Sequence, residues 1–304
     1  MMKKVFNHLS RYQYSNSIIK RNESLVVLKQ LKLPSNQTSI AFTREGNKES
    51  DLVFVALHGG PGSHNDFKYL AETLKISMNE SYELIRFDLP GYGKSERLKS
   101  SIPDSKYFSN SVIETLSNIN ILNNKHIVVI GHSLGGHVAV NIAKKCNISG
   151  IVLLSTVCCR PHKALGNDNG YKISKWLGLN VNHFIYGNFI QLFLEFMYKK
   201  ILGFPRHASK DEIVWTQQRV AYLNWNEFTE EVKNLTTPVM FAYTLDDKLL
   251  EPPIFKELAN ILSNNSTFQE NKIIEYNDGG HNIQKTKATD ISNQIKEWLH
   301  IILK

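Results

Sequence analysis

The 304-residue chain predicts an α/β protein built on a doubly wound, mostly parallel sheet. Strand-like apolar runs alternate with helix-like segments over about residues 38–156, and they do so again from residue 237 to the end. This alternation is typical of parallel strands whose connecting helices cover both faces of one sheet. The stretch between these two regions does not alternate. It predicts loops and helices, the helices over residues 171–177, 181–202, 210–222 and 225–234.

Residues 131–136, Gly-His-Ser-Leu-Gly-Gly, carry the strongest functional signal. They follow an apolar β-branched run at residues 127–130 and precede a helix-like run at residues 137–145. A serine between glycines at a strand–turn–helix junction is typical of a nucleophile elbow, because a Cβ at either glycine would clash where strand and helix nearly touch. We therefore expect Ser133 to be a nucleophile. The alternative is a structural serine in a tight turn.

An acid and a base follow the serine in chain order, each just beyond a strand-like run. Residues 238–243 lead to the pair Asp246 and Asp247, and residues 272–276 lead to His281. A serine nucleophile needs a base to take its proton, and the base needs an acid to orient it. Since active sites gather at the carboxyl ends of parallel strands, we expect these side chains to converge.

Two glycine-rich loops follow other strand-like runs. Residues 52–57 lead to His-Gly-Gly-Pro-Gly at residues 58–62, where a free backbone N–H could face a developing oxyanion. Residues 86–95 contain the pattern D-x-x-G-x-G-x-S.

These four features together resemble the α/β-hydrolase superfamily, over about residues 36–160 and 236–304. The resemblance implies the α/β-hydrolase fold with a helical cap inserted after the sixth strand, over the serine. The expected parts are a basic N-terminal extension at residues 1–30, a core of residues 36–156 and 236–304, and a cap at residues 157–235.

The resemblance also implies a role for each motif residue. Ser133 is the nucleophile and His281 the general base. The backbone N–H groups of Gly60 and Leu134 form the oxyanion hole. The acid belongs to the pair of neighbouring aspartates.

The register of the family's acid motif favours Asp247 over Asp246. Family members commonly carry Gly-x-x-Asp, followed one residue later by two apolar residues. Asp247 is followed by Lys248 and then by two leucines, whereas Asp246 is one residue out of step and Thr244 replaces the usual glycine. Asp246 remains the alternative acid; otherwise it is a turn residue that bonds its own backbone.

Other histidines near these motifs are expected to be structural. His132 points away from its neighbour on the turn, and His58 ties backbone segments together. His162, His183 and His207 fall in the expected cap, where any of them could touch substrate.

The net charge of +8 raises the question of an anionic partner. Residues 1–22 hold five lysines and arginines and no acid, so the rest of the chain is nearly balanced. With no nucleic-acid motif and no apolar run long enough to span a membrane, we expect neither nucleic-acid binding nor a transmembrane segment. Cys146, Cys158 and Cys159 form no disulfide framework, and no metal-ligand spacing occurs, so no metal and no cofactor is expected.

The N-terminal segment resembles a mitochondrial transit peptide. It is basic and contains serines, it lacks the apolar stretch of a secretory signal, and Val5, Phe6 and Leu9 fall on one helical face. The alternative is a basic extension without a targeting role. With cysteine usage that favours a reducing compartment, we expect an intracellular protein, cytoplasmic or mitochondrial.

An unusually apolar helix is expected over residues 184–202. Its polar residues recur at every fourth position as one stripe, and nearly all others are aromatic or aliphatic. The favoured interpretation is a helix in the core of the cap. The alternatives are a pocket lining for an acyl or aryl group, with Phe189, Phe193 and Met197 as candidates, and docking on a membrane surface, which a stripe that is not strongly basic disfavours.

These observations predict a serine hydrolase that cleaves an ester-like bond in a small substrate with an apolar acyl or aryl part, through an acyl-enzyme. A serine at the elbow disfavours dehalogenase and epoxide-hydrolase chemistry, since those relatives use aspartate there. One alternative is a catalytically silent or receptor-like protein on the same fold. Another is an aminopeptidase like the proline iminopeptidases, which residues 58–62 favour and the elbow sequence opposes.

Overall fold

A computed structural model of the chain describes residues 27–79, 81–98, 101–123, 125–204, 208–265 and 270–304. Of the predicted extension at residues 1–30, all but the last four residues lie outside the described residues. His207 also lies outside them. None of the helices in these ranges has the length and apolar character that crossing a bilayer requires.

The described residues form one sheet of eight strands in the order β1-β2-β4-β3-β5-β6-β7-β8. The pairs β1–β2 and β2–β4 are antiparallel, and every other pair is parallel, which confirms the predicted doubly wound, mostly parallel sheet. The strands are β1 (Leu28–Lys32), β2 (Ser39–Gly46), β3 (Leu52–Leu57), β4 (Glu83–Phe87), β5 (His126–His132), β6 (Gly150–Leu154), β7 (Val239–Thr244) and β8 (Lys272–Tyr276).

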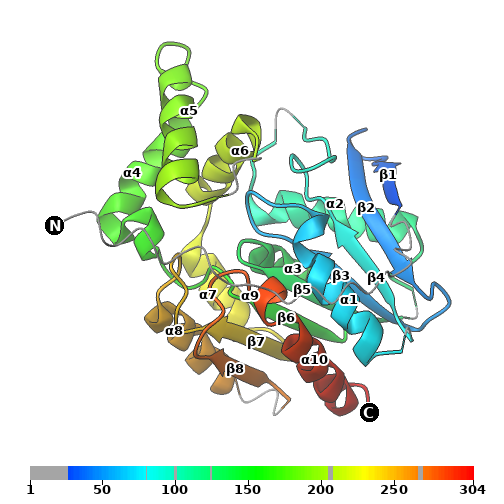
Figure 1. The fold of residues 1–304 in the computed structure, drawn as a ribbon. Coiled ribbons are helices and arrows are strands. Elements are labelled where there is room, and N and C mark those ends of the chain that lie inside the picture. The colour runs from blue at the N-terminus through cyan, green and yellow to red at the C-terminus, as the bar shows by residue number, and fades with distance from the viewer. Residues whose placement is uncertain (1–26, 80, 99–100, 124, 205–207, 266–269) are drawn as a thin grey trace, which may run out of the picture.

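Two hydrophobic cores lie on the two faces of this sheet, because successive side chains of a strand point to opposite faces. Val53 and Val55 of β3 pack into the core that includes α2, α3 and α8, whereas Phe54 and Ala56 pack into the core that includes α1 and α10. Figure 1 shows these helices around the sheet. Their bounds, with those of the short helices η1 and α9, are η1 (His64–Phe67), α1 (Lys68–Ser77), α2 (Ser105–Asn118), α3 (Gly135–Lys145), α8 (Pro252–Ser263), α9 (Ile283–Thr286) and α10 (Ala288–Ile302).

Between β6 and β7 the chain forms a helical segment, residues 157–235, called the insertion below. Helices α4, α5 and α6 share a small core around Ile190, Leu194 and Ile213 and stand together beyond one edge of the sheet (Figure 1). Helix α7 packs on α3 and α8 instead. The helices of the insertion are η2 (Lys163–Leu165), α4 (Asn167–Asn180), α5 (Gly187–Phe196), the π-helical turn η3 (Met197–Ile201), α6 (Lys210–Ala221) and α7 (Trp225–Lys233).

Two elements differ from the sequence-based expectation. Strand β1 was not expected, and it adds an edge strand before residue 36, where the predicted core begins. The helix expected over residues 181–202 begins only at Gly187, because the chain turns after α4: the His183 N–H bonds the Asn180 carbonyl, and the His183 ring stacks on Tyr186 at 3.8 Å.

Candidate active site

Ser133 lies at the apex of the turn between β5 and α3. Its φ of +52° lies in the left-handed region, which costs strain for a residue with a Cβ. The turn is tight: a Cβ at Gly131 would lie 2.7 Å from backbone atoms of Gly135 and Gly136, and a Cβ at Gly135 would lie 2.1 Å from the carbonyl oxygen of Leu57. The predicted clash at both glycines is confirmed, although at Gly135 the obstructing atom belongs to β3 and not to β5.

Asp247 and His281 meet across the loops that follow β7 and β8. His281 Nδ1 lies 2.7 Å from Asp247 Oδ2. The other carboxylate oxygen accepts the backbone N–H groups of Leu249 and Leu250 at 2.8 and 3.1 Å. Burial raises the pKa of the Asp247 carboxyl, but the hydrogen bonds, that of His281 foremost, outweigh burial and hold the pKa below its ordinary value. An ionised carboxylate here makes His281 Nδ1 the donor and leaves Nε2 available as a base.

Asp246 is exposed and has a different partner. Its Oδ1 accepts the Gly280 N–H at 2.8 Å, which holds the backbone of the loop before His281. Desolvation raises the pKa of the Asp246 carboxyl, but hydrogen bonds, that of the Gly280 N–H foremost, hold the pKa below its ordinary value. Of the two neighbouring aspartates, Asp247 alone is hydrogen bonded to the imidazole.

Ser133 and His281 line the same cavity. No hydrogen bond joins their side chains among the described residues. In ligand-free enzymes the contact between nucleophile and base is often long, and it tightens when substrate binds.

Gly60 and Leu134 bring two backbone N–H groups to this cavity. Within the described part of the chain, no acceptor is recorded for either group. The N–H of Leu134 lies at the start of α3, where the helix dipole adds positive potential. The two groups are therefore available for an oxyanion.

His58 fixes the start of the loop that carries Gly60. Its Nδ1–H donates to the Gly59 carbonyl at 2.6 Å, and its Nε2 accepts the Leu89 N–H at 2.9 Å. Burial lowers the pKa of His58, so the ring stays neutral with both nitrogens engaged. The expected structural role of His58 is confirmed.

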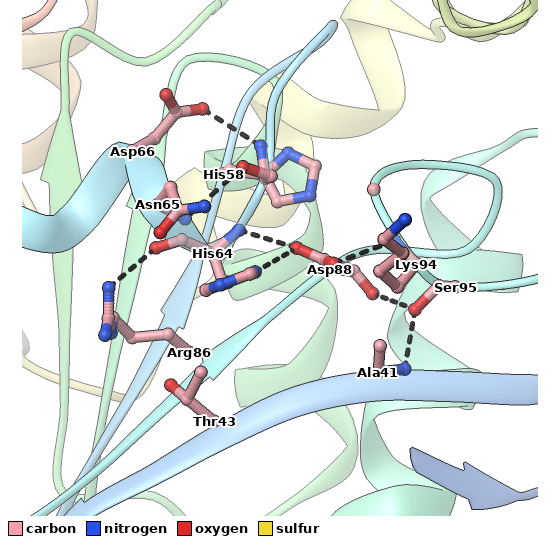
Figure 2. Close-up of polar contacts among 12 residues, drawn as sticks. Ala41, Thr43, His58, His64, Asn65, Asp66, Arg86, Asp88, Lys94 and Ser95 are labelled. Carbon is pink, nitrogen blue, oxygen red and sulfur yellow. Dashed lines mark hydrogen bonds and ion pairs between the residues drawn. The ribbon is translucent and has the colours of Figure 1, made fainter. Parts of the chain in front are cut away.

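Asp88 holds the end of the same loop in place through hydrogen bonds with His64 (Figure 2). Its Oδ1 accepts both the backbone N–H and the Nδ1–H of His64 at 2.7 Å, and its Oδ2 accepts the Lys94 N–H at 2.9 Å. Ser95 Oγ donates to the Asp88 carbonyl at 2.6 Å and accepts the Ala41 N–H at 2.8 Å. The pattern D-x-x-G-x-G-x-S thus supplies a carboxylate and a hydroxyl that join the loop carrying Gly60 to β2 and to the loop after β4.

His132 holds the loop of His281, a role that the sequence did not reveal. Its Nε2–H donates to the main-chain carbonyl of His281 at 3.0 Å, and its Nδ1 lies 3.4 Å from Gln284 Nε2. Burial, followed by the neighbouring charge of His281, lowers the pKa of His132 to about 3. A neutral ring with both nitrogens engaged cannot serve Ser133 as a base.

The cavity has a volume of about 220 Å³ and is lined mainly by apolar side chains. Its charged side chains other than the histidines are Asp66 and Lys285, which pair with each other at 2.7 Å. Among the described residues, none that the insertion contributes to the lining carries a carboxylate. The insertion contributes Val157, His162, Ala164, Leu165, Tyr198, Leu202, Gly203, Phe204, Thr216, Val220 and Leu223.

The candidates named for a pocket lining on the apolar helix do not line this cavity. Phe189 and Phe193 are exposed, and Met197 is half-buried outside the cavity. The helix reaches the cavity only through Tyr198 and Leu202, just beyond α5. The favoured interpretation, a helix in the core of the cap, holds for one face of α5, whereas a second apolar face is left exposed by the described part of the chain.

The structure separates the histidines of the insertion. His162 lines the cavity, donates Nδ1–H to the Leu249 carbonyl at 3.1 Å, and has a pKa lowered to about 4, mainly by burial. His183 stacks on Tyr186 outside the cavity. His207 lies outside the described residues.

Comparison with known protein families gives a match over most of the chain. The family described as "Alpha/beta hydrolase of unknown function (DUF1057)" matches residues 41–294. An uncharacterized hydrolase of Bacillus subtilis (strain 168), YugF, is 24% identical over 264 residues, which are 81% of this chain and 89% of that protein. A proline iminopeptidase of Saccharolobus solfataricus is 31% identical over 119 residues, only 38% of this chain and 36% of that enzyme.

Solved structures share the fold. A thermophilic esterase from Thermogutta terrifontis superposes with a TM-score of 0.66 and 16% identity, over 91% of this chain and 99% of that one. An epoxide hydrolase from metagenomes of hot environments has a TM-score of 0.67 and 14% identity, over 90% and 98%. At these identities the likeness concerns the fold alone, and the chemistry must be argued from the site.

Proposed function

Because the chain belongs to the α/β-hydrolase family of unknown function that matches residues 41–294, we propose that it is a serine hydrolase. The substrate is a small molecule with an ester-like bond and an apolar acyl or aryl part. The observation that carries the proposal is the hydrogen bond of 2.7 Å between Asp247 and His281 beside the cavity that Ser133 lines.

The proposed first half-reaction forms an acyl-enzyme. His281 Nε2 takes the proton of Ser133 as Oγ attacks the substrate carbonyl, and the N–H groups of Gly60 and Leu134 hold the oxyanion. Asp247 keeps the imidazole in the required tautomer and stabilises its positive charge. His281 then gives the proton to the leaving alcohol.

The second half-reaction releases the acid. His281 takes a proton from water, which attacks the acyl carbonyl, and returns that proton to Ser133 Oγ as the acyl bond breaks. Each oxyanion donor contributes roughly 3 kcal/mol to the stability of the transition state in comparable serine enzymes.

The lining of the cavity supports an uncharged, apolar acyl group. Leu165, Leu202 and Leu223 bring aliphatic side chains from the insertion, which we propose to act as the cap. The small volume favours a short chain. A free amine, as in an aminopeptidase substrate, would need a carboxylate, and Asp66 is already paired with Lys285.

A fluorophosphonate probe and a substrate panel test this proposal. The probe should label the parent protein at Ser133 and leave Ser133→Ala unlabelled. The panel should show esters of short acyl chains cleaved in preference to amides and to substrates with a free amine. A folded parent protein that reacts with neither probe nor ester would favour the receptor-like alternative, and preference for an N-terminal amine would favour the aminopeptidase.

We further propose that the protein acts inside the cell, in the cytoplasm or in mitochondria. The support is the basic, acid-free composition of residues 1–22. A reporter fused to residues 1–30 distinguishes the two compartments by its location.

A further inference from the structure

Helix α5 carries two apolar faces that point in different directions. Ile190 and Leu194 pack into the core of the insertion. Phe189 and Phe193 lie on the other face and are 74% and 43% exposed. The polar stripe, in which Lys199 pairs with Glu195 at 2.8 Å, runs along the helix beside them. The described residues therefore bury one apolar face of this helix and leave the second exposed.

The segments next to this second face carry further exposed apolar side chains. Phe184 and Ile185, in the connection between α4 and α5, are 88% and 72% exposed, and that connection lies at the end of the insertion far from the sheet (Figure 1). Trp176 of α4 and Phe196 of α5 are also exposed. We call Trp176, Phe184, Ile185, Phe189, Phe193 and Phe196 the outer apolar surface. Exposed apolar clusters of this kind mark interaction sites.

The charges around this surface are mainly positive. From α4 to η3 the chain holds four lysines, at positions 172, 175, 199 and 200, against two acidic residues. Lys172 and Lys175 are exposed and lie in the same turns of α4 as Trp176, with the exposed Ile173 between them. The chain as a whole carries a net charge of +8.

We propose that the outer apolar surface docks on the surface of an anionic phospholipid bilayer. Aromatic and aliphatic side chains on a protruding helical element enter the boundary between headgroups and acyl chains, while flanking lysines extend to the negative headgroups. Each lysine near such a surface strengthens binding about fivefold, and each buried phenylalanine about tenfold or more.

Charge argues against the two other occupants that this chain could supply. A second copy would bring two lysine-rich surfaces together, which like-charge repulsion opposes. Residues 1–22 hold five basic residues and no acid, so this segment is repelled as well. An anionic bilayer complements the lysines and the apolar side chains together.

At its other end the outer apolar surface reaches Phe196, which is close in sequence to the lining of the cavity. Tyr198 and Leu202 follow directly on α5, and both line the cavity at Ser133. The docking itself does not depend on the proposed hydrolase chemistry, so the Ser133→Ala variant should bind bilayers as the parent protein does.

Vesicle flotation with the full-length chain tests the proposal. The parent protein should float with vesicles that contain about 30% phosphatidylserine in phosphatidylcholine, and bind pure phosphatidylcholine at least about tenfold more weakly. The double variant Phe189→Ser/Phe193→Ser should lose at least about tenfold in partition coefficient on the anionic vesicles. Its matched control, Ile76→Ser/Ile301→Ser, removes two exposed apolar side chains from α1 and α10 and should lose less than about twofold.

A charge reversal gives an independent readout. Lys172→Glu/Lys175→Glu should weaken binding to anionic vesicles by more than about tenfold, whereas Lys296→Glu on α10 should not. The circular dichroism spectrum of each variant shows whether it is folded. Hydrolysis of a short-chain ester in free solution by the variants that keep Ser133 is a second check.

Three results would overturn the proposal. In the first, the parent protein fails to float with anionic vesicles. In the second, Phe189→Ser/Phe193→Ser floats as the parent protein does, which places the lipid contact elsewhere, such as in residues 1–22. In the third, sedimentation equilibrium shows a dimer of the parent protein that this variant converts to a monomer, which assigns the surface to a second copy.

Discussion

Asp246 and Asp247 are neighbours in the sequence with separate tasks. Asp247 reaches His281 Nδ1 at 2.7 Å, whereas Asp246 holds the Gly280 N–H and hence the backbone of the same loop. Both residues lie in the turn that follows β7, which buries the Asp247 carboxylate and leaves the Asp246 carboxylate exposed.

Asp247→Asn should lower kcat far more than Asp246→Asn. The amide favours the wrong tautomer of His281, a change that costs roughly 10⁴-fold in another serine-hydrolase triad. Asp246→Asn keeps an oxygen that can accept the Gly280 N–H, so we expect a loss under about tenfold. Steady-state kinetics on one ester substrate measure both variants, and a reversed order would make Asp246 the acid.

His132 should act as a positioning residue for His281. His132→Phe removes the donor to the His281 carbonyl, and the displaced imidazole should lower kcat about tenfold with little change in KM. His132→Gln, which offers an N–H in a similar place, should restore part of the loss. If kcat/KM falls equally in both variants, and in proportion to their loss of folding stability, His132 has only a structural role.

Sequence motifs indicated the candidate catalytic residues but not the contacts that hold those residues in place. Ser133 and His281 stand in short patterns that can be recognised without a structure. The bond from His132 to the His281 carbonyl and the pair Asp66–Lys285 join residues far apart in the sequence, and no local pattern encodes them.

A buried strand was predictable from its apolar composition. The run at residues 52–57 matches β3, which is buried along nearly its whole length and ends at turn residues. The run at residues 272–276 matches β8, although this strand lies at the sheet edge and is only half-buried. Strand β1, Leu-Lys-Gln-Leu-Lys, lies at the sheet edge and was not predicted, because only Leu28 and Leu31 are apolar and their spacing of three does not match the period of a strand. For α5, periodicity revealed two apolar faces, but which face the protein covers depends on the packing of α4 and α6.

The residues just beyond α5 should set acyl-chain preference. Leu202→Ala enlarges the cavity and should move the optimum toward longer acyl chains, by about 1–3 kcal/mol of discrimination per methylene. Phe193→Ala is the matched control on the exposed face, where the optimum should stay unchanged. A panel of esters of increasing chain length measures the shift; an unchanged profile in Leu202→Ala, or an equal shift in the control, contradicts this lining.

At the scale of the whole molecule, buried histidines link folding to pH. Burial lowers the pKa of His137 to about 3 and that of His162 to about 4. His137 is fixed by a hydrogen bond of its Nε2–H to the Val157 carbonyl and by stacking on Phe228 at 3.9 Å. The unfolded chain binds protons at these rings below pH ~6.5, whereas the native protein does not.

The free energy of unfolding should therefore fall as pH drops from ~6.5 toward 5, by up to ~1.4 kcal/mol per pH unit for each such histidine. Urea unfolding of the parent protein and of His137→Gln at pH 7.5 and pH 5 measures this. The variant keeps a donor for Val157 and should show a shallower fall, while the exposed His300→Gln should match the parent slope. An unchanged slope in His137→Gln would contradict a neutral, buried His137.

The order of strands brings Ser133, Asp247 and His281 together from three loops at the carboxyl ends of β5, β7 and β8. This convergence follows from parallel topology, which the alternation of strands and helices predicted. The proposed triad therefore depends on the whole fold, since no two of its members come from the same loop.

The proposed chemistry requires Ser133 and His281 to act as a unit, and a double-mutant cycle tests this most directly. We predict that Ser133→Ala and His281→Ala each reduce kcat by several orders of magnitude, and that the double variant is little worse than either single variant. Steady-state hydrolysis of one ester substrate by the three variants and the parent protein supplies the rates. Losses that multiply in the double variant would show that the two residues act independently and would contradict the triad.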